Sequence, residues 1–167
     1  MLLALQSIPC GSAEEGPSLE DKVKTAFLYK FTKYIRWPEG GPADDFRIAV
    51  IGESGILGPL RELARERLAD GRKIRVERLR NVDEIGPCHI LFIASTERER
   101  LREILKKAEP KGVLTVGDGK GFAAEGVVVN FVIVDGRVRF EISRRAAGRS
   151  GLEISSQLLK LAILVKE

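Results

Sequence analysis

Cys88 and His89 are adjacent, and a thiol beside an imidazole is the pair that a cysteine nucleophile and its general base require. The two residues open the apolar run 88–93, which is typical of a strand, and neighbouring strand residues point to opposite faces of a sheet. The sequence therefore predicts that the two side chains do not meet and that Cys88 is a buried structural residue. The alternative is a thiol that pairs transiently with another chain.

The sequence also lacks the residues that a metal site or a nucleotide site needs. His89 is the only histidine, and no cluster of Asp and Glu with ligand spacing takes the place of further histidines. Gly52, Gly55 and Gly58 lie between a strand and a helix, but the first two are three residues apart where the dinucleotide-binding fingerprint needs two. We therefore expect no enzyme activity, no metal and no cofactor.

A small-molecule site has two weak candidate residues. Asp118 follows a strand in a glycine-rich loop, and α/β folds bind ligands in loops at the carboxyl ends of their strands. One carboxylate without a base, nucleophile or metal makes a poor active site, and a role in the turn explains Asp118 as well. Trp37 ends a segment rich in aromatic residues and is the second candidate.

The C-terminal segment is the strongest candidate for binding a partner. Arg144, Arg145 and Arg149 precede the run 151–165, whose apolar positions would surround a helix on nearly every side. Such a helix is either buried between the sheet and the first helix, or it presents an apolar patch with an arginine rim. The residues predicted to contact the partner are Glu141, Arg145, Arg149, Leu152 and Leu159.

Helices and strands must position these candidate residues, and the hydrophobic pattern predicts which ones. It indicates an α/β fold with a mostly parallel sheet flanked by helices, ending in a β-hairpin and a helix. Helices are expected over 18–36, 57–68, 95–107 (capped by Ser95) and 151–165, and strands over 46–51, 73–77, 88–93, 112–116, 127–134 and 137–142. In the first helix the apolar stripe contains Val23, Ala26, Phe27, Phe31 and Tyr34, with Thr25 and Thr32 on the opposite face. Asp135-Gly136 is the turn of the hairpin.

Length, charge and hydropathy indicate the class of protein and its domain organisation. A chain of 167 residues with a net charge of +4 and no basic stripe interleaved with aromatics is not typical of a nucleic-acid-binding protein. Residues 1–13 are interpreted as a truncated signal peptide or a disordered tail, and 19–167 as one domain. No later stretch is apolar for long enough to span a bilayer, so direct membrane insertion is not expected.

Five segments together resemble the YfiR-like family of periplasmic regulators, in family order and over nearly the whole chain after the N-terminal segment. They are 24–38 (KTAFLYKFTKYIRWP), 88–93 (CHILFI), 114–118 (LTVGD) with Gly121-Phe122, 138–142 (VRFEI) and 151–162 (GLEISSQLLKLA). The resemblance implies a periplasmic α/β domain that forms dimers and represses a membrane-anchored diguanylate cyclase by binding its periplasmic part, which lowers cyclic di-GMP. It also implies that Cys88 is normally paired, yet the predicted mature chain holds no second cysteine for an internal bridge.

The sequence thus favours a regulator that binds a diguanylate cyclase or sensor protein and forms a homodimer. The rival function is a periplasmic small-molecule sensor that uses Trp37 and Asp118.

Overall fold

The computed structural model describes residues 16–109 and 112–166, so the predicted signal peptide (1–13) with Cys10 lies outside the described residues. The helices are α1 (Leu19–Tyr34), α2 (Leu57–Glu66), α3 (Leu101–Ala108), α4 (Arg144–Arg149) and α5 (Ser156–Leu161), with 3₁₀ helices η1 (Val82–Glu84) and η2 (Ser95–Arg100). The strands are β1 (Ile35–Arg36), β2 (Phe46–Ile51), β3 (Leu68–Ala69), β4 (Arg72–Leu79), β5 (Ile90–Ile93), β6 (Leu114–Gly117), β7 (Val129–Val134), β8 (Arg137–Ile142), β9 (Glu153–Ile154) and β10 (Ile163–Leu164).

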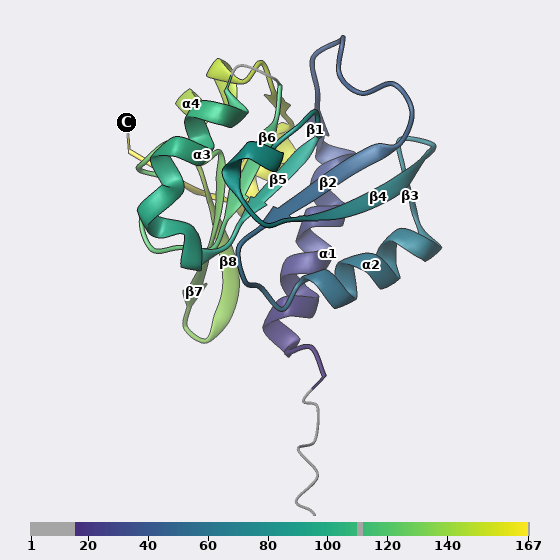
Figure 1. Cartoon of the computed structure of the whole chain (residues 1–167). Helices are drawn as coiled ribbons and strands as arrows, with labels where there is room; N and C mark the ends of the chain where they lie inside the picture. Colours follow the sequence, from purple (N-terminus) through teal and green to yellow (C-terminus); the bar gives the residue numbers. More distant parts are fainter. Residues whose placement is uncertain (1–15, 110–111, 167) are drawn as a thin grey trace, which may run out of the picture.

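Among the described residues, eight strands form one sheet in the order β10-β8-β7-β6-β5-β2-β4-β3 (Figure 1). The pairs from β4 through β2, β5 and β6 to β7 are parallel, and the pairs β7–β8 and β3–β4 are antiparallel. Strand β10 runs parallel to β8, and β1 pairs separately with β9. The predicted fold class, a mostly parallel sheet flanked by helices, is confirmed.

The centre of the sheet, β2, β5 and β6, is buried on both faces, which is why these strands are largely apolar. In β5, Ile90 and Phe92 face a core formed with α1, α2 and α5. Leu91 and Ile93 face a second core formed with α3 and η1. The helices therefore cover both faces and leave the sheet's edges and loops as the places where function can be added.

The first helix begins as predicted, with Ser18 and Asp21 forming a reciprocal capping box. Its buried face differs from the predicted stripe: Ala26 is exposed, whereas Thr25 and Thr32 are buried. Each threonine hydroxyl donates to a backbone carbonyl within the helix, of Asp21 and Tyr29 respectively. This internal pairing lets a polar residue enter the core at low cost.

Ser95 does not cap the third predicted helix. Residues Ser95–Arg100 form η2, and the regular helix α3 starts only at Leu101. The N-cap of η2 is Ala94, which has no capping side chain; instead the backbone N–H of Ser95 donates to the Asp118 side chain, 2.7 Å away. A carboxylate from another loop thus replaces the local cap.

The predicted helix over 151–165 is wrong. The segment breaks into β9, α5 and β10. Gly151 has a φ of +70°, a left-handed conformation that interrupts helical geometry. Ser155 then caps α5 by accepting from the Leu158 N–H, and the branched residue Ile163 enters β10. The apolar residues are numerous here because they serve several short elements, not because one helix is buried on all sides.

We predict that Leu152 contributes to stability and that nearby Leu161 does not. Leu152 is 6% exposed and belongs to the core cluster that also contains Leu28 and Phe31 of α1, whereas Leu161 is 50% exposed. Leu152→Ala should lower the free energy of unfolding by about 2–5 kcal/mol, through lost burial and the cavity left behind. Leu161→Ala should change it by only about 0.5 kcal/mol. Urea denaturation of both variants checks this, and equal effects would contradict the placement of Leu152.

Candidate functional site

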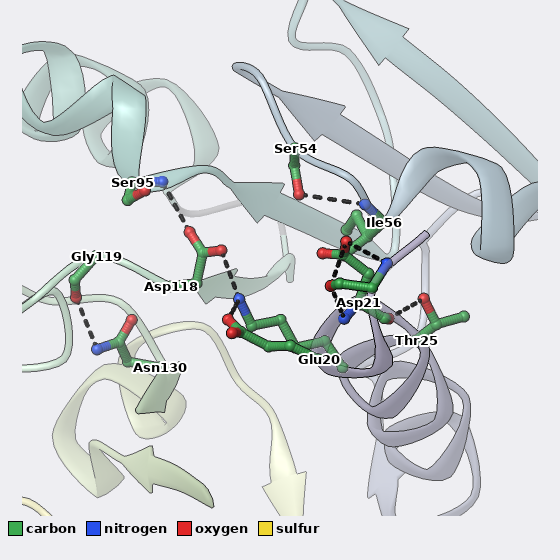
Figure 2. A network of polar contacts seen from close by, with 11 residues as sticks. Glu20, Asp21, Thr25, Ser54, Ile56, Ser95, Asp118, Gly119 and Asn130 are labelled. Carbon is green, nitrogen blue, oxygen red and sulfur yellow. Dashed lines mark hydrogen bonds and ion pairs between the residues drawn. The ribbon is translucent and has the colours of Figure 1, made fainter. Parts of the chain in front are cut away.

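At the carboxyl edge of the sheet, a buried ion pair joins α1 to the loop after β6. Lys24 Nζ lies 3.0 Å from Asp118 Oδ2 and 2.5 Å from a carboxylate oxygen of Glu20, and the Lys24 side chain is only 8% exposed. The other oxygen of Asp118 accepts the Ser95 N–H (Figure 2). Both carboxylate oxygens of Asp118 are therefore engaged by the protein itself, which favours a structural role over ligand contact.

Burial by itself lowers the pKa of Lys24, because it disfavours the charged form. The hydrogen bonds and charge attraction from Glu20 and Asp118 act the other way and together outweigh burial, so the pKa of Lys24 is raised above 10.5. The ammonium is thus charged at any physiological pH. It has no use as a general base, and the group remains a fixed cation.

Glu141, one of the predicted partner contacts, belongs to the same region of the sheet. It is half-buried in β8, and its Oε2 accepts from Asn130 Nδ2 at 3.4 Å. Asn130 is fully buried and also donates to the Gly119 carbonyl at 2.9 Å (Figure 2). Glu141 is therefore oriented by a buried amide behind it, which leaves a definite direction for any contact that it makes with a partner.

A hollow of about 1010 Å³ opens at the opposite, amino edge of the sheet. Trp37, Phe46, Arg72 and His89 line it together with the loop 39–43. Trp37 Nε1 donates to the His89 carbonyl at 2.8 Å, and the His89 ring stacks on Phe46 with centroids 4.4 Å apart. Trp37 and Asp118, the two predicted ligand residues, thus lie at opposite ends of the strands, and the structure does not bring them together.

The imidazole of His89 is buried and neutral. Its Nδ1 accepts the backbone N–H of Arg47 at 3.0 Å, which assigns the ring proton to Nε2, on the side of the Pro42 carbonyl. Burial, chiefly, and the nearby charges of Arg72 and Arg47 lower the pKa of His89 to about 4, although the contact with Pro42 opposes them. Since Arg72 also donates to the Pro42 carbonyl, both side chains hold the loop 39–43 in place.

The predicted arginine rim is exposed on α4. Arg145 and Arg149 both face solvent, and Arg149 Nε lies 3.8 Å from a carboxylate oxygen of Glu109. A cavity of about 260 Å³ separates α3 from α4, and the cationic side chains Arg102, Lys106 and Arg149 border it with the carboxylates of Glu109 and Glu125. The border of this cavity thus carries three cationic and two anionic side chains, a small positive excess.

The apolar part of this surface differs from the predicted set. Leu152 is buried, and Leu159 is half-buried against the core. Leu161 and Leu164 are instead the large exposed residues, with Leu164 46% exposed. Leu164 pairs with Ile142 of β8, two residues before α4 begins, so it lies beside the base of the arginine helix.

Within residues 16–109 and 112–166, no group of three or more His, Cys, Asp or Glu side chains is arranged to hold a metal ion. Cys88 is buried in the core beneath α3, while the His89 ring stacks on Phe46 in the opposite core, so the two side chains do point to opposite faces. In the same described part of the chain, no helix is long and apolar enough to cross a membrane.

A family model described as YfiR/HmsC-like matches residues 21–163. The chain belongs to the YfiR/HmsC-like family. Proteins of this family are regulatory rather than catalytic, are periplasmic, and act with membrane diguanylate cyclases. A search of curated proteins found no match.

Solved structures share the fold of this YfiR/HmsC-like chain at low sequence identity. A conserved domain protein from Vibrio cholerae O1 biovar El Tor matches with a TM-score of 0.61 and 10% identity, over 87% of this chain and 60% of that one. An ABC domain in complex with L-Trp from Streptococcus pneumoniae matches with a TM-score of 0.59 and 12% identity, over 83% of this chain and 59% of that one. The chain thus spans about three fifths of both proteins, and the likeness concerns the fold.

Two features of this family member escaped the sequence reasoning. Arg72 joins His89 and Trp37 in the large hollow although it is distant from both in sequence, and no local pattern marked it. Leu161 and Leu164 belonged to the apolar run, but a helical period gave no reason to separate them from the buried Leu152. Their exposure follows from the break at Gly151, which a glycine after α4 does signal.

We predict that the single histidine titrates with a midpoint of about 4. Because the pKa of His89 is lower in the folded than in the unfolded chain, its contribution to stability is present above pH 6.5 and is lost as the pH falls through 4. Proton NMR of the imidazole ring follows the titration directly. His89→Gln, which keeps an acceptor but does not titrate, should show a shallower fall in Tm over this window. A midpoint near 6.5 in the folded protein would contradict the buried, neutral assignment.

Proposed function

We propose that this protein is a periplasmic repressor that binds the periplasmic part of a membrane-anchored diguanylate cyclase and thereby lowers cyclic di-GMP signalling. The observation that carries the proposal is the pair of exposed arginines on α4, together with the exposed Leu164, which pairs with Ile142 just before that helix. Family membership supplies the class of partner. Nucleic acid and direct membrane insertion are not part of the proposed activity.

The chemistry of this surface suits a protein partner with carboxylates. Guanidinium groups form bidentate hydrogen bonds with carboxylates and are retained at interfaces, where they enclose an apolar centre. Arg145 and Arg149 would form that rim, and the half-buried Glu141 would add a carboxylate to the contact.

 Leu159, which is half-buried, would add apolar area to the contact, whereas Leu152 would support the surface from within the core.

A homodimer is also part of this proposal. The exposed Leu161 and Leu164 would be covered in such a dimer or by the cyclase, since burying apolar side chains favours association.

We predict that reversing the charge of the rim weakens capture of the partner. Arg145→Glu with Arg149→Glu should weaken binding by about tenfold or more, because two rim cations become like charges for an acidic partner. The probes are the periplasmic domains of the membrane-anchored diguanylate cyclases encoded in the same genome, purified individually and measured by calorimetry.

The matched control is Arg61→Glu with Arg65→Glu, two exposed arginines of α2 on another part of the molecule. This control should bind as the wild type does and should show a similar Tm. The proposal fails if no cyclase domain binds the wild type, or if both double variants bind equally well.

A second candidate function, a small-molecule sensor, is favoured by the hollow of about 1010 Å³ around Trp37. The lining of this hollow is mainly polar, but Trp37 and Phe46 supply aromatic surface and Arg72 supplies a cation that could orient a small ligand. Asp118 takes no part in this hollow and is therefore not the residue to test.

A thermal-shift screen with a metabolite panel separates the two functions. Under the proposed partner-binding function, no compound should raise the Tm of the wild type in a way that Trp37→Phe removes. A concentration-dependent shift that disappears in Trp37→Phe, while Arg61→Glu keeps it, would establish the sensor function instead.

A further inference from the structure

Half of strand β8 has an open edge. On one side β8 pairs with β7 along its whole length, from Arg137 to Ile142. On the other side β10 pairs only with Glu141 and Ile142. No described strand lies along the remaining part, residues 137–140, which forms the outer half of the hairpin seen at the lower left of Figure 1.

The hairpin geometry determines which backbone groups face this edge. Asp135 and Gly136 both have positive φ values, +50° and +71°, as a two-residue turn of type I′ requires. The residues that flank such a turn, Val134 and Arg137, exchange hydrogen bonds, and the pattern alternates along an antiparallel pair. Val138 therefore turns both its N–H and its C=O away from β7, toward the open edge.

The two faces of this edge have different chemistry. Arg137 and Arg139 are exposed on one face. On the other face, Val138 lies opposite Ile133, which is 53% exposed. An open strand edge with exposed apolar residues is a template for pairing with another strand.

The two arginines indicate which kind of strand the open edge of β8 would bind: a second copy of β8 or a strand from another protein. A second copy of this chain, paired through its own β8, would bring Arg137 and Arg139 of one protomer next to the same arginines of the other. Like charges opposite each other destabilise a strand pair, whereas opposite charges contribute about 0.2–1 kcal/mol for each pair. The edge is therefore suited to a strand with acidic side chains on the arginine face.

We propose that residues 137–140 bind, by strand addition, an extended segment of the partner protein in which acidic and apolar residues alternate. The acidic side chains pair with Arg137 and Arg139, and the apolar ones cover Val138 and Ile133. The segment's backbone bonds to the N–H and C=O of Val138. This inference rests on the proposed partner-binding function, because the segment belongs to the partner.

The test uses two short, capped, fluorescently labelled peptides, one alternating glutamate and valine and the other alternating lysine and valine. Fluorescence anisotropy with the full chain should show the glutamate peptide binding about tenfold more tightly or better. Arg137→Glu with Arg139→Glu should reverse this preference. Equal binding of the two peptides by the wild type, or an unchanged preference in the variant, would overturn the proposal.

Val138→Pro tests the backbone contact. Proline removes the outward N–H but none of the bonds to β7, so the hairpin should persist, as prolines on edge strands do. The variant should lose the glutamate peptide, and retained binding would contradict strand addition. If Val138→Pro fails to fold, a glutamate–valine peptide with alternate backbone amides N-methylated replaces it, and the wild type should not bind that peptide.

The same variants separate this inference from the function on which it rests. If Arg145→Glu with Arg149→Glu weakens capture of a cyclase domain by about tenfold or more while Val138→Pro leaves capture unchanged, the proposed function holds and the assignment of the β8 edge is wrong. If Val138→Pro also weakens capture by about tenfold, the edge and the α4 rim act on the same partner.

Discussion

A buried cation on α1 determines how the helical layer sits on the sheet. The rest of the α1 face is largely apolar and aromatic, and apolar contacts alone specify a helix position weakly, whereas a buried ammonium must meet carboxylates. Lys24 meets Asp118 at the end of β6, and the second oxygen of Asp118 holds the start of η2. At the C-terminal end of α1 the chain continues to Trp37, which donates to the His89 carbonyl. The helix therefore links the carboxyl edge of the sheet to its amino edge.

The parts of the fold that follow local rules were predictable from the sequence. The central strands are apolar on both faces, and Asp135-Gly136 has the φ values that its turn type demands. The segment 151–165 was not predictable by periodicity, because its leucines serve α5 and two short strands whose pairing partners, β1 and β8, are distant in sequence. Ser95 was misassigned for the same reason, since Asp118 comes from another loop.

The candidate site also has features that local sequence predicts and features that depend on contacts between distant segments. Chain order already places Trp37 before a strand and Asp118 after one, so the two belong to opposite edges of a parallel sheet. The arginines of α4 were recognised from their clustering, whereas the open edge of β8 depends on how short β10 is. Both surfaces belong to the last third of the chain, where short elements close the sheet incompletely. That incomplete closure is what makes this region available to a partner.

Hydrogen–deuterium exchange of the complex with a bound cyclase domain tests the central claim, that the protein acts through its C-terminal surfaces. The account predicts slower exchange on binding at the amides of Val138 and of residues 144–164, with no change in the loop 39–43 beside Trp37. Protection confined to the loop 39–43, with residues 137–164 unaffected, would contradict it and place the partner at the large hollow.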